Sequence, residues 1–415
     1  MSCQLVAFRK KPKKHTIVPL RILFPINNFN NLPKEENKGV IKMAIPILYR
    51  EELKEYDFGG GHPFLGKRIG EFIDYLKIKI PQKNFEFIKP KLAENSDLEL
   101  IHSKEYIDFV ERFYQALISG KELPKASEIS QFLSTDNLPG KNPGNLILGA
   151  KFIVGAAKMA GELVWEGKYE KVISFGGLHH AKRNYGEGFC IFNDVAILVE
   201  NLKRKYSLNQ PNLERILILD TDAHAGNGTA EIFYQDPKVL FIDIHQMPQT
   251  LYPGTGFINQ IGAGPGKGFT VNCPLFPGTG WDSYQYIFEN IIFPLAQEFQ
   301  PQIIIRNGGS DPYFKDPLTQ LGLTISDFKK IGENVRELAK ISNGKEVDLI
   351  CSGYHQKAIF AGWLALISGL VEIEVLLEEP EPIPQKIKKD SCYQFTQEMV
   401  RELKKQLKNY WKCFN

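Results

Sequence analysis

The sequence lacks the features that mark several large classes of protein. Its six cysteines are scattered through 415 residues without CxxC spacing or a disulfide-dense pattern, so a reducing compartment is the simpler interpretation. The formal net charge is only +3, too small for bulk electrostatics to require a nucleic acid or an acidic membrane. The longest apolar run, residues 360–371, is too short to cross a bilayer. We therefore expect a cytoplasmic globular protein without membrane or nucleic-acid partners.

Residues 1–42 also lack the small-residue cleavage site and the long apolar core of a secretory signal. A basic cluster at residues 9–14 precedes a stretch at 27–38 that is rich in Asn, Pro and Lys. This segment is either a targeting or nucleic-acid arm or, as we favour, a disordered, solvated extension; a start codon assigned too early gives the same pattern. The folded part is then predicted to open at Met43 and to continue to residue 415 as a single domain. Its last features are a linker at 378–384 and an amphipathic helix.

Short apolar runs rich in β-branched residues alternate with helical patterns along residues 43–415. Strands are predicted at residues 171–176, 215–220, 239–245, 302–306 and 347–353. Helices are predicted at residues 66–76, 104–117, 145–166, 194–205, 282–299, 325–341, 356–370 and 394–411. Nearly continuous hydrophobic strands separated by helices indicate a parallel sheet that is covered on both faces. The fold class is therefore α/β.

Glycines and polar residues follow each of the predicted strands. Because ligands gather at the carboxyl ends of parallel strands, these segments are expected to meet at one edge of the sheet. They are residues 176–180 (GGLHH), 220–228 (DTDAHAGNG), 252–256 (YPGTG), 308–312 (GGSDP) and 352–355 (SGYH).

Candidate metal ligands stand in two of these segments. Asp222 and His224 point to the same side of the chain because strand side chains alternate, and carboxylate with imidazole suits Zn²⁺ and similar ions. Taken alone, such a pair more often caps a helix, and Asp311 before a proline readily starts a turn. The adjacent His179 and His180 are more informative, since two histidines in tandem after two glycines have no obvious packing role.

Taken together and in this order, the motifs resemble the histone deacetylase superfamily. The matching segments are residues 176–196 (GGLHHAKRNYGEGFCIFNDVA), 220–229 (DTDAHAGNGT), 252–256, 308–324 (GGSDPYFKDPLTQLGLT) and 352–354. Residues 56–68 (YDFGGGHPFLGKR) and 102–110 (HSKEYIDFV) look like the opening of the acetoin-utilisation-type branch of bacteria and archaea. The resemblance runs from about Met43 to at least Leu370. It implies the arginase/deacetylase fold, in which helices flank a central parallel sheet of about eight strands in three layers.

The resemblance also implies one divalent metal ion, Zn²⁺ or alternatively Fe²⁺, on Asp222, His224 and Asp311. Such an ion polarises an acetyl carbonyl and lowers the pKa of a bound water. In the same resemblance His180 is the general base and later the acid for the leaving amine. His179 is its electrostatic or proton-sharing neighbour.

Further roles follow from the same resemblance. Asp220 would orient His179 and would contribute to a structural K⁺ site. Tyr354 would donate its hydroxyl to the tetrahedral oxyanion. Asn227 stands where some branches of the family carry an aspartate opposite the second histidine. Because Asn has no charge, His180 should be less basic than in those branches.

The walls of a substrate tunnel are expected at Gly188, Phe189 and Tyr252, with Tyr in place of a more usual Phe. Ordinary core packing is the alternative for the two aromatic residues. Asp136 resembles a rim acid that holds substrate backbone amides, and loop capping explains it equally well. Arg68 either lines an acetate-release channel or lies on the surface of a helix.

Three further positions depart from the family pattern. Ala225 replaces the second histidine that usually follows the metal-binding one, and Arg306 brings unusual polarity to the end of a strand. Ser352 interrupts a glycine run before Tyr354 and is expected to shift that loop. A second Asp-x-His motif, at residues 243–245, is expected near the K⁺ site rather than at the catalytic metal. These differences are predicted to affect rate and specificity more than metal binding.

The predicted function is that of a deacetylase that hydrolyses an acetyl-amine bond of the acetyl-lysine type. One alternative keeps the fold but takes acetylated polyamines or another small acetylated amine. A two-manganese ureohydrolase is a weaker alternative, since that chemistry needs a further Asp-x-Asp pair near Asp311. A homologue that keeps the fold without turnover is the third.

Overall fold

Eight parallel strands form one central sheet in the computed structural model, which describes residues 44–206 and 212–415. The strand order is β2-β1-β3-β8-β7-β4-β5-β6, and each neighbouring pair is parallel. The strands are β1 (Ile45–Leu48), β2 (Phe85–Ile88), β3 (Lys171–Phe175), β4 (Ile216–Asp220), β5 (Val239–Gln246), β6 (Thr270–Leu275), β7 (Ile303–Gly308) and β8 (Glu346–Ile350). The expectation for residues 1–42 lies outside the described residues.

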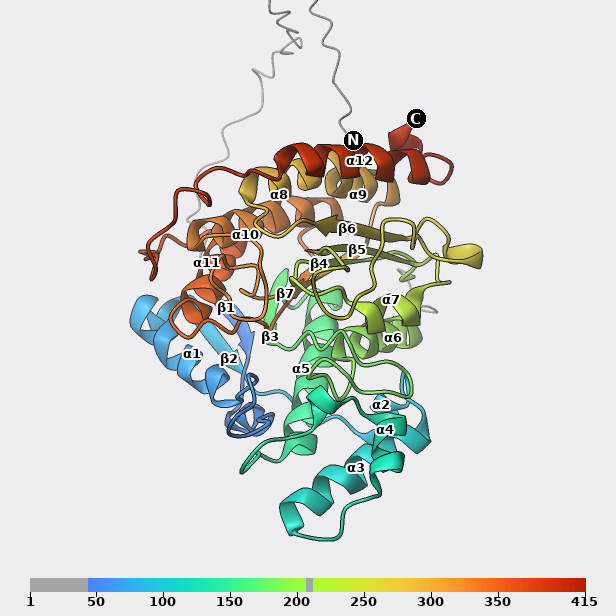
Figure 1. Ribbon diagram of the computed structural model, residues 1–415, viewed down its shortest axis with the longest axis vertical. Helices are drawn as coiled ribbons and strands as arrows, with labels where there is room; N and C mark the ends of the chain where they lie inside the picture. The colour runs from blue at the N-terminus through green and yellow to red at the C-terminus, as the bar shows by residue number, and fades with distance from the viewer. Residues whose placement is uncertain (1–43, 207–211) are drawn as a thin grey trace, which may run out of the picture. The chain divides into compact units, whose positions relative to one another are not determined.

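Helices cover both faces of this sheet (Figure 1). They are α1 (Lys67–Lys79), α2 (Asn95–Leu98), α3 (Lys104–Ser119), α4 (Ala126–Phe132), α5 (Leu146–Trp165), α6 (Asp194–Tyr206), α7 (Asn227–Phe233), α8 (Trp281–Ile287), α9 (Phe293–Phe299), α10 (Ile325–Ala339), α11 (Ile359–Val371) and α12 (Tyr393–Leu407). Among the described residues, no helix is long and apolar enough to cross a membrane. The three-layer α/β architecture predicted from the sequence is confirmed.

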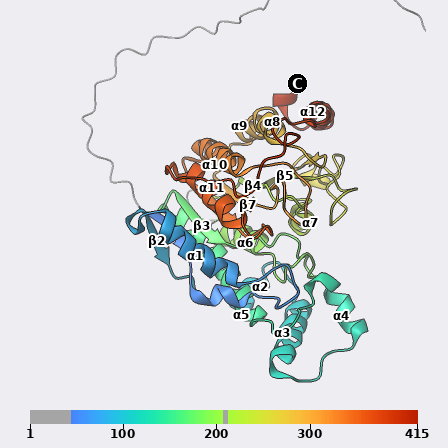
Figure 2. The same ribbon diagram turned by 60° about the vertical axis from the view of Figure 1, so that its left-hand side comes forward.

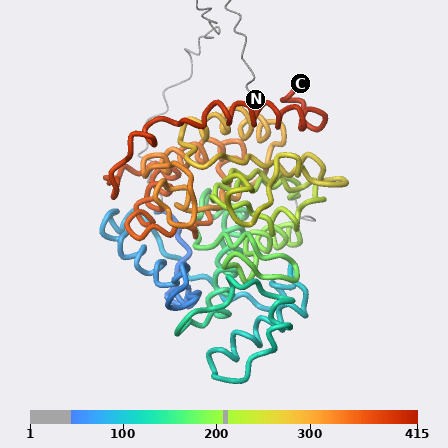
Figure 3. Tube along the Cα trace, in the orientation of Figure 1, coloured from blue at the N-terminus to red at the C-terminus, as the bar shows by residue number. Residues whose placement is uncertain are grey.

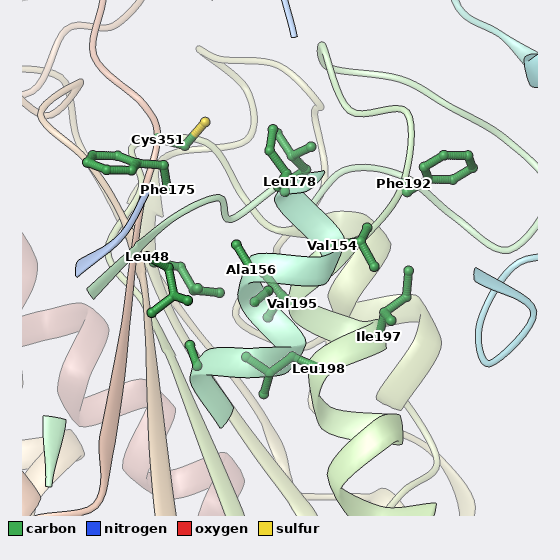
Figure 4. Close-up of a cluster of buried hydrophobic side chains, with 14 of the residues drawn as sticks. Leu48, Val154, Ala156, Phe175, Leu178, Phe192, Val195, Ile197, Leu198 and Cys351 are labelled. Atoms are coloured by element: carbon green, nitrogen blue, oxygen red, sulfur yellow. The ribbon is translucent and has the colours of Figure 1, made fainter. Parts of the chain in front are cut away.

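The alternation of residues along β4 shows how the two apolar layers arise. Ile216 and Ile218 belong to the cluster that includes α5 and α6, whereas Leu217 and Leu219 belong to the cluster with α8, α9 and α10. Successive side chains point to opposite faces, so a strand that is apolar throughout serves both layers. Figure 4 shows one part of the first cluster, where side chains of β1, β3, α5 and α6 meet.

The sequence missed three strands, and each has a physical reason. β1 has only four residues and contains Pro46, β2 is a four-residue edge strand, and β6 contains Pro274. Such short or proline-containing strands give little periodic signal. The helix predicted at 282–299 is divided, since a π-helical turn at Phe288–Ile292 separates α8 from α9.

Peripheral elements complete the described part of the chain. α3 and α4 extend from one end of the sheet in both ribbon views (Figures 1 and 2). α12 packs against α8 at the other end of the sheet, and Figure 3 shows the course of the chain through this last helix. The segment predicted as a linker is anchored at Glu379, whose carboxylate accepts hydrogen bonds from the Tyr313 hydroxyl and the Ile325 amide.

A buried ion pair lies within the sheet on β7 and β8. Arg306 is paired with Asp348, and neither residue is more than 1% exposed. Glu346 lies nearby with both carboxylate oxygens unpaired among the described residues. Burial, followed by the Asp348 carboxylate, raises the pKa of Glu346 well above its usual value. The polarity noted at Arg306 in the sequence is therefore that of an internal ion pair.

Removing one member of this pair should be costly. Asp348→Ala removes the carboxylate that is hydrogen-bonded to the buried Arg306 guanidinium, and we expect the free energy of unfolding to fall by about 3–5 kcal/mol. Urea unfolding followed by tryptophan fluorescence measures the change. The double replacement of Arg306 by Met and Asp348 by Leu should lose less than the single one. An equal or larger loss in the double variant would contradict the assignment.

Candidate metal centre and active site

The segments that follow β3, β8, β7 and β4 emerge side by side, since these strands are neighbours in the sheet. The strand register places Asp220 level with Asn307 and Gly308 level with Ile350. This adjacency explains why residues far apart in the sequence meet at one edge. It also places polar side chains where ligands bind in parallel α/β folds.

Asp222, His224 and Asp311 form a cluster that could hold a metal ion, the one such cluster found within residues 44–206 and 212–415. One ligand atom from each residue lies within 4.8 Å of the others. His224 Nδ1 is 3.0 Å from Asp222 Oδ1 and 3.0 Å from Asp311 Oδ2. Two carboxylates and one imidazole nitrogen are a donor set that suits Zn²⁺ or Fe²⁺ and leaves room for further ligands.

The electrostatics of the cluster favour a positive charge between its donors. Burial disfavours the imidazolium, yet hydrogen bonds and charge from Asp222 and Asp311 raise the pKa of His224 to about 10. Burial and the Asp222 carboxylate raise the pKa of Asp311 to about 7. Two buried carboxylates that repel each other at this separation would both be stabilised by a divalent cation, so the residues present fit the metal.

Ser352, one of the departures from the family pattern, contacts this cluster directly. Its hydroxyl donates a hydrogen bond of 2.8 Å to Asp311 Oδ1, and its carbonyl accepts one of 2.7 Å from Trp363 Nε1. The Ala223 amide also donates to Asp311 Oδ1 at 3.3 Å. These contacts hold one Asp311 oxygen and leave Oδ2 toward His224.

The two histidines of the pair have different partners. His179 Nδ1 lies 2.7 Å from Asp220 Oδ2, whereas His180 Nδ1 lies 2.7 Å from Asn227 Oδ1. Burial opposes charge on His179, but Asp220 and Asp222 raise its pKa to about 9. Burial, followed by the charges of His179 and His224, lowers the pKa of His180 well below its usual value. His180 is therefore the neutral imidazole of the pair, able to accept a proton.

The His180 ring packs against the backbone of Gly188. A Cβ at residue 188 would lie 2.3 Å from the His180 Cδ2 atom, and φ of Gly188 is +61°. Only glycine meets both conditions. Phe189 has φ of +64°, which is strained for a residue with a side chain. The Asp136 carboxylate accepts hydrogen bonds from the Gly188 amide at 3.1 Å and from the Ser134 hydroxyl, so it holds this loop.

A cavity of about 30 Å³ is lined by several of the predicted site residues. Its lining includes both histidines of the pair, two metal-ligand candidates, and one residue each of the predicted tunnel wall and the predicted oxyanion loop: His179, His180, Asp222, His224, Phe189 and Tyr354. Tyr252 is not among the lining residues; its ring is 40% exposed and lies edge-on to His180 with centroids 5.2 Å apart. Phe189 faces the Tyr354 ring at 6.1 Å.

The loop that carries Tyr354 is held by charged side chains. The Tyr354 amide donates to Asp316 Oδ2 at 2.7 Å, and Arg68 Nη1 donates to the Gly353 carbonyl at 3.1 Å. Arg68 is only 6% exposed, so the alternative of a surface arginine on a helix is wrong. Burial raises the pKa of Tyr354 well above its usual value, so its hydroxyl stays protonated.

Asp220 has a second buried acid as a neighbour. The Asp243 carboxylate accepts a hydrogen bond from the Gly226 amide at 2.9 Å, while its other oxygen has no partner among the described residues. Burial, followed by the Asp220 charge, raises the pKa of Asp243 well above its usual value. A buried, unpaired carboxylate oxygen beside a second carboxylate fits a monovalent cation.

Two anchoring residues were not singled out in the sequence. Asp194 accepts hydrogen bonds from the Gly177 and Leu178 amides at 2.9 and 2.6 Å and fixes the turn before the histidine pair. Its position at the start of a predicted helix was a signal, because an acid there can bind free amides. Glu187 accepts a hydrogen bond from Asn227 Nδ2 at 2.8 Å. No local pattern pointed to that contact.

Comparisons with known proteins agree with this geometry. Residues 62–370 match the histone deacetylase domain model. A probable deacetylase of Archaeoglobus fulgidus is 33% identical over 90% of this chain and 100% of its own length. The acetoin utilization protein AcuC of Bacillus subtilis is 32% identical over 74% of this chain and 77% of its own. The HDA15 HD domain has a TM-score of 0.72 at 21% identity, covering 89% of this chain and 97% of that chain, which confirms the fold.

Proposed function

The chain belongs to the histone deacetylase family, and on that premise we propose that it is a metal-dependent deacetylase that hydrolyses an acetyl-amine bond of the acetyl-lysine type. The observation that supports this proposal best is that candidate metal ligands, a candidate base and a candidate oxyanion donor line the same cavity. Asp222 and His224 line it together with the neutral His180 and the protonated Tyr354. Asp311 completes the metal cluster.

Asp222, His224 and Asp311 would hold the metal ion, Zn²⁺ or Fe²⁺. When bound, that ion supplies polarisation of the acetyl carbonyl and activation of a water molecule. His180 accepts the proton of the water and later gives it to the leaving amine. The Tyr354 hydroxyl donates a hydrogen bond to the oxyanion of the tetrahedral intermediate.

The remaining groups orient these five residues and the substrate. Asp220 holds His179 through Nδ1, and the positive charge of His179 disfavours premature protonation of its neighbour His180. A K⁺ ion at Asp220 and Asp243 would offset the repulsion between their carboxylates. Gly188 and Phe189, which line the cavity, would form walls for the alkyl chain of an acylated amine, and Tyr252, whose ring lies beside His180, would extend them outward. Asp136 supports these walls through Gly188.

Acetate release from a panel of acetylated amines tests this function. We expect the zinc- or iron-loaded protein to carry close to one equivalent of metal and to hydrolyse acetyl-lysine peptides, with loss of activity on chelation. Acetylpolyamines in the same panel identify a small-amine hydrolase. Two equivalents of metal would favour the ureohydrolase chemistry. Inactivity of the loaded protein on every acetyl-amine would overturn the proposal in favour of a fold homologue without turnover.

A further inference from the structure

The side-chain amide of Asn227 lies between the His180 imidazole and the Glu187 carboxylate. Its Oδ1 atom is 2.7 Å from His180 Nδ1, and its Nδ2 atom donates to Glu187 Oε1 at 2.8 Å. The Glu187 side chain is 14% exposed and is paired with Lys182 Nζ at 2.9 Å. An imidazole, an amide and a carboxylate therefore form one continuous chain of hydrogen bonds.

The loop backbone fixes Glu187 in this place. The Cys190 amide donates to the Glu187 carbonyl at 3.0 Å, and the Lys182 amide donates to the Tyr185 carbonyl at 2.8 Å. These bonds close the turn that follows the histidine pair, and the Gly188 backbone packs against His180 directly after it. Glu187 is thus held by the same loop that holds the imidazole.

An amide can present either its oxygen or its NH₂ group to an imidazole, and the choice decides which ring nitrogen carries the proton. If the Asn227 oxygen faces His180, Nδ1 is the N–H and Nε2 keeps a free lone pair. If the NH₂ group faces His180, Nδ1 is the acceptor and the proton moves to Nε2. Only the first arrangement leaves the second nitrogen able to act as a base.

A carboxylate accepts hydrogen bonds and donates none, so it removes this ambiguity. The Asn227 NH₂ group must face Glu187, and its oxygen must then face His180. We propose that Glu187 is a positioning residue that sets the tautomer of His180 through Asn227. The catalytic consequence rests on the proposed function, whereas the tautomer itself does not.

The kinetics of Glu187→Ala in two backgrounds, the natural protein and the Asn227→Asp variant, distinguish this positioning role from general support of the loop. In the natural Asn227 background, Glu187→Ala should lower kcat by about 10-fold or more, because most molecules then hold the wrong tautomer. In an Asn227→Asp background the same change should cost less than about 2-fold, since a carboxylate at 227 can only accept from His180. An equal loss in both backgrounds would overturn the proposal.

Two single variants act as matched comparisons. Glu187→Gln should keep most of the activity, because Lys182 favours the Gln oxygen at the shared position and that oxygen still accepts from Asn227. Glu231→Ala should leave kcat unchanged, since Glu231 is another acid near Lys182, at 3.9 Å, with a side chain 56% exposed. A large loss in Glu187→Gln would contradict the orientation argument.

A spectroscopic measurement tests the tautomer without turnover. In zinc-loaded protein labelled with ¹⁵N-histidine, with His180 assigned by its loss in His180→Gln, we expect a protonated Nδ1 and an unprotonated Nε2. Glu187→Ala should shift most of the population to the tautomer with protonated Nε2, at unchanged zinc content. Protonated Nε2 in the natural protein, or an unaltered tautomer in Glu187→Ala, would refute the role of Glu187. A correct tautomer in an inactive protein would instead refute the proposed deacetylase.

Discussion

His180→Ala should lower kcat on an acetyl-lysine peptide by about 10³-fold while the protein keeps its metal. The reason is that His180 is the neutral imidazole of the site, with its pKa lowered chiefly by burial, and is therefore free to accept a proton. Its ring lies in the cavity but is not one of the clustered donor atoms. Proton transfer is therefore lost and metal binding is retained.

Steady-state kinetics together with metal analysis of the same sample measures both quantities. His355→Ala is a suitable control, because that imidazole is directed at Glu381, 3.9 Å away, and does not line the cavity. It should keep activity within a few-fold. If His180→Ala lost its metal, or kept most of its activity, the assignment of His180 as the base would be wrong.

Much of the site could be anticipated because its residues follow strands. A parallel sheet brings the carboxyl ends of its strands to one edge, so a prediction of β4 and β7 already placed Asp222 near Asp311. The same logic placed the segment after β3 beside them. The family and the fold inferred from these motifs are confirmed.

Contacts between loops could not be anticipated in this way. Glu187 meets Asn227 across 40 positions of sequence, and neither the turn before Glu187 nor the start of α7 has a periodicity that fixes their separation. Ser352 was expected only to loosen a glycine run, yet its hydroxyl binds Asp311 across 41 positions. In both cases a side-chain hydrogen bond depends on loop geometry that the hydrophobic pattern does not encode.

The chemistry of Ser352 and Glu187 has a common feature. Ser352 hydrogen-bonds to the proposed metal ligand Asp311, and Glu187 hydrogen-bonds to Asn227, the partner of the proposed base His180. Each contact fixes the orientation of the side chain that it meets. Such supporting contacts tune metal affinity and ligand orientation in metalloenzymes. Differences from the family pattern at such positions can therefore preserve the reaction while changing how the groups are held.

Asp311→Ala should abolish stable metal binding and, with it, activity. Asp311 is fully buried and supplies one of the two carboxylates of the cluster. Without it, the two donors Asp222 and His224 remain, and we expect metal affinity to fall by more than about 100-fold, beyond the loss typical of a supporting residue. The equivalent of metal in the natural protein should be absent from the purified variant.

Thermal unfolding with and without a chelator provides a readout that does not depend on turnover. Metal bound only to the folded state raises Tm, so chelation should lower Tm of the natural protein and leave that of Asp311→Ala unchanged. Asp282→Ala, at an exposed acid in the first turn of α8, should respond like the natural protein. Burial and the Asp222 carboxylate raise the pKa of Asp311 to about 7 in the metal-free protein. The metal-free natural protein should therefore lose stability as pH rises from about 4 to about 7, and metal-free Asp311→Ala should lose less over the same range. Retention of a full equivalent of metal by Asp311→Ala would place the metal site elsewhere.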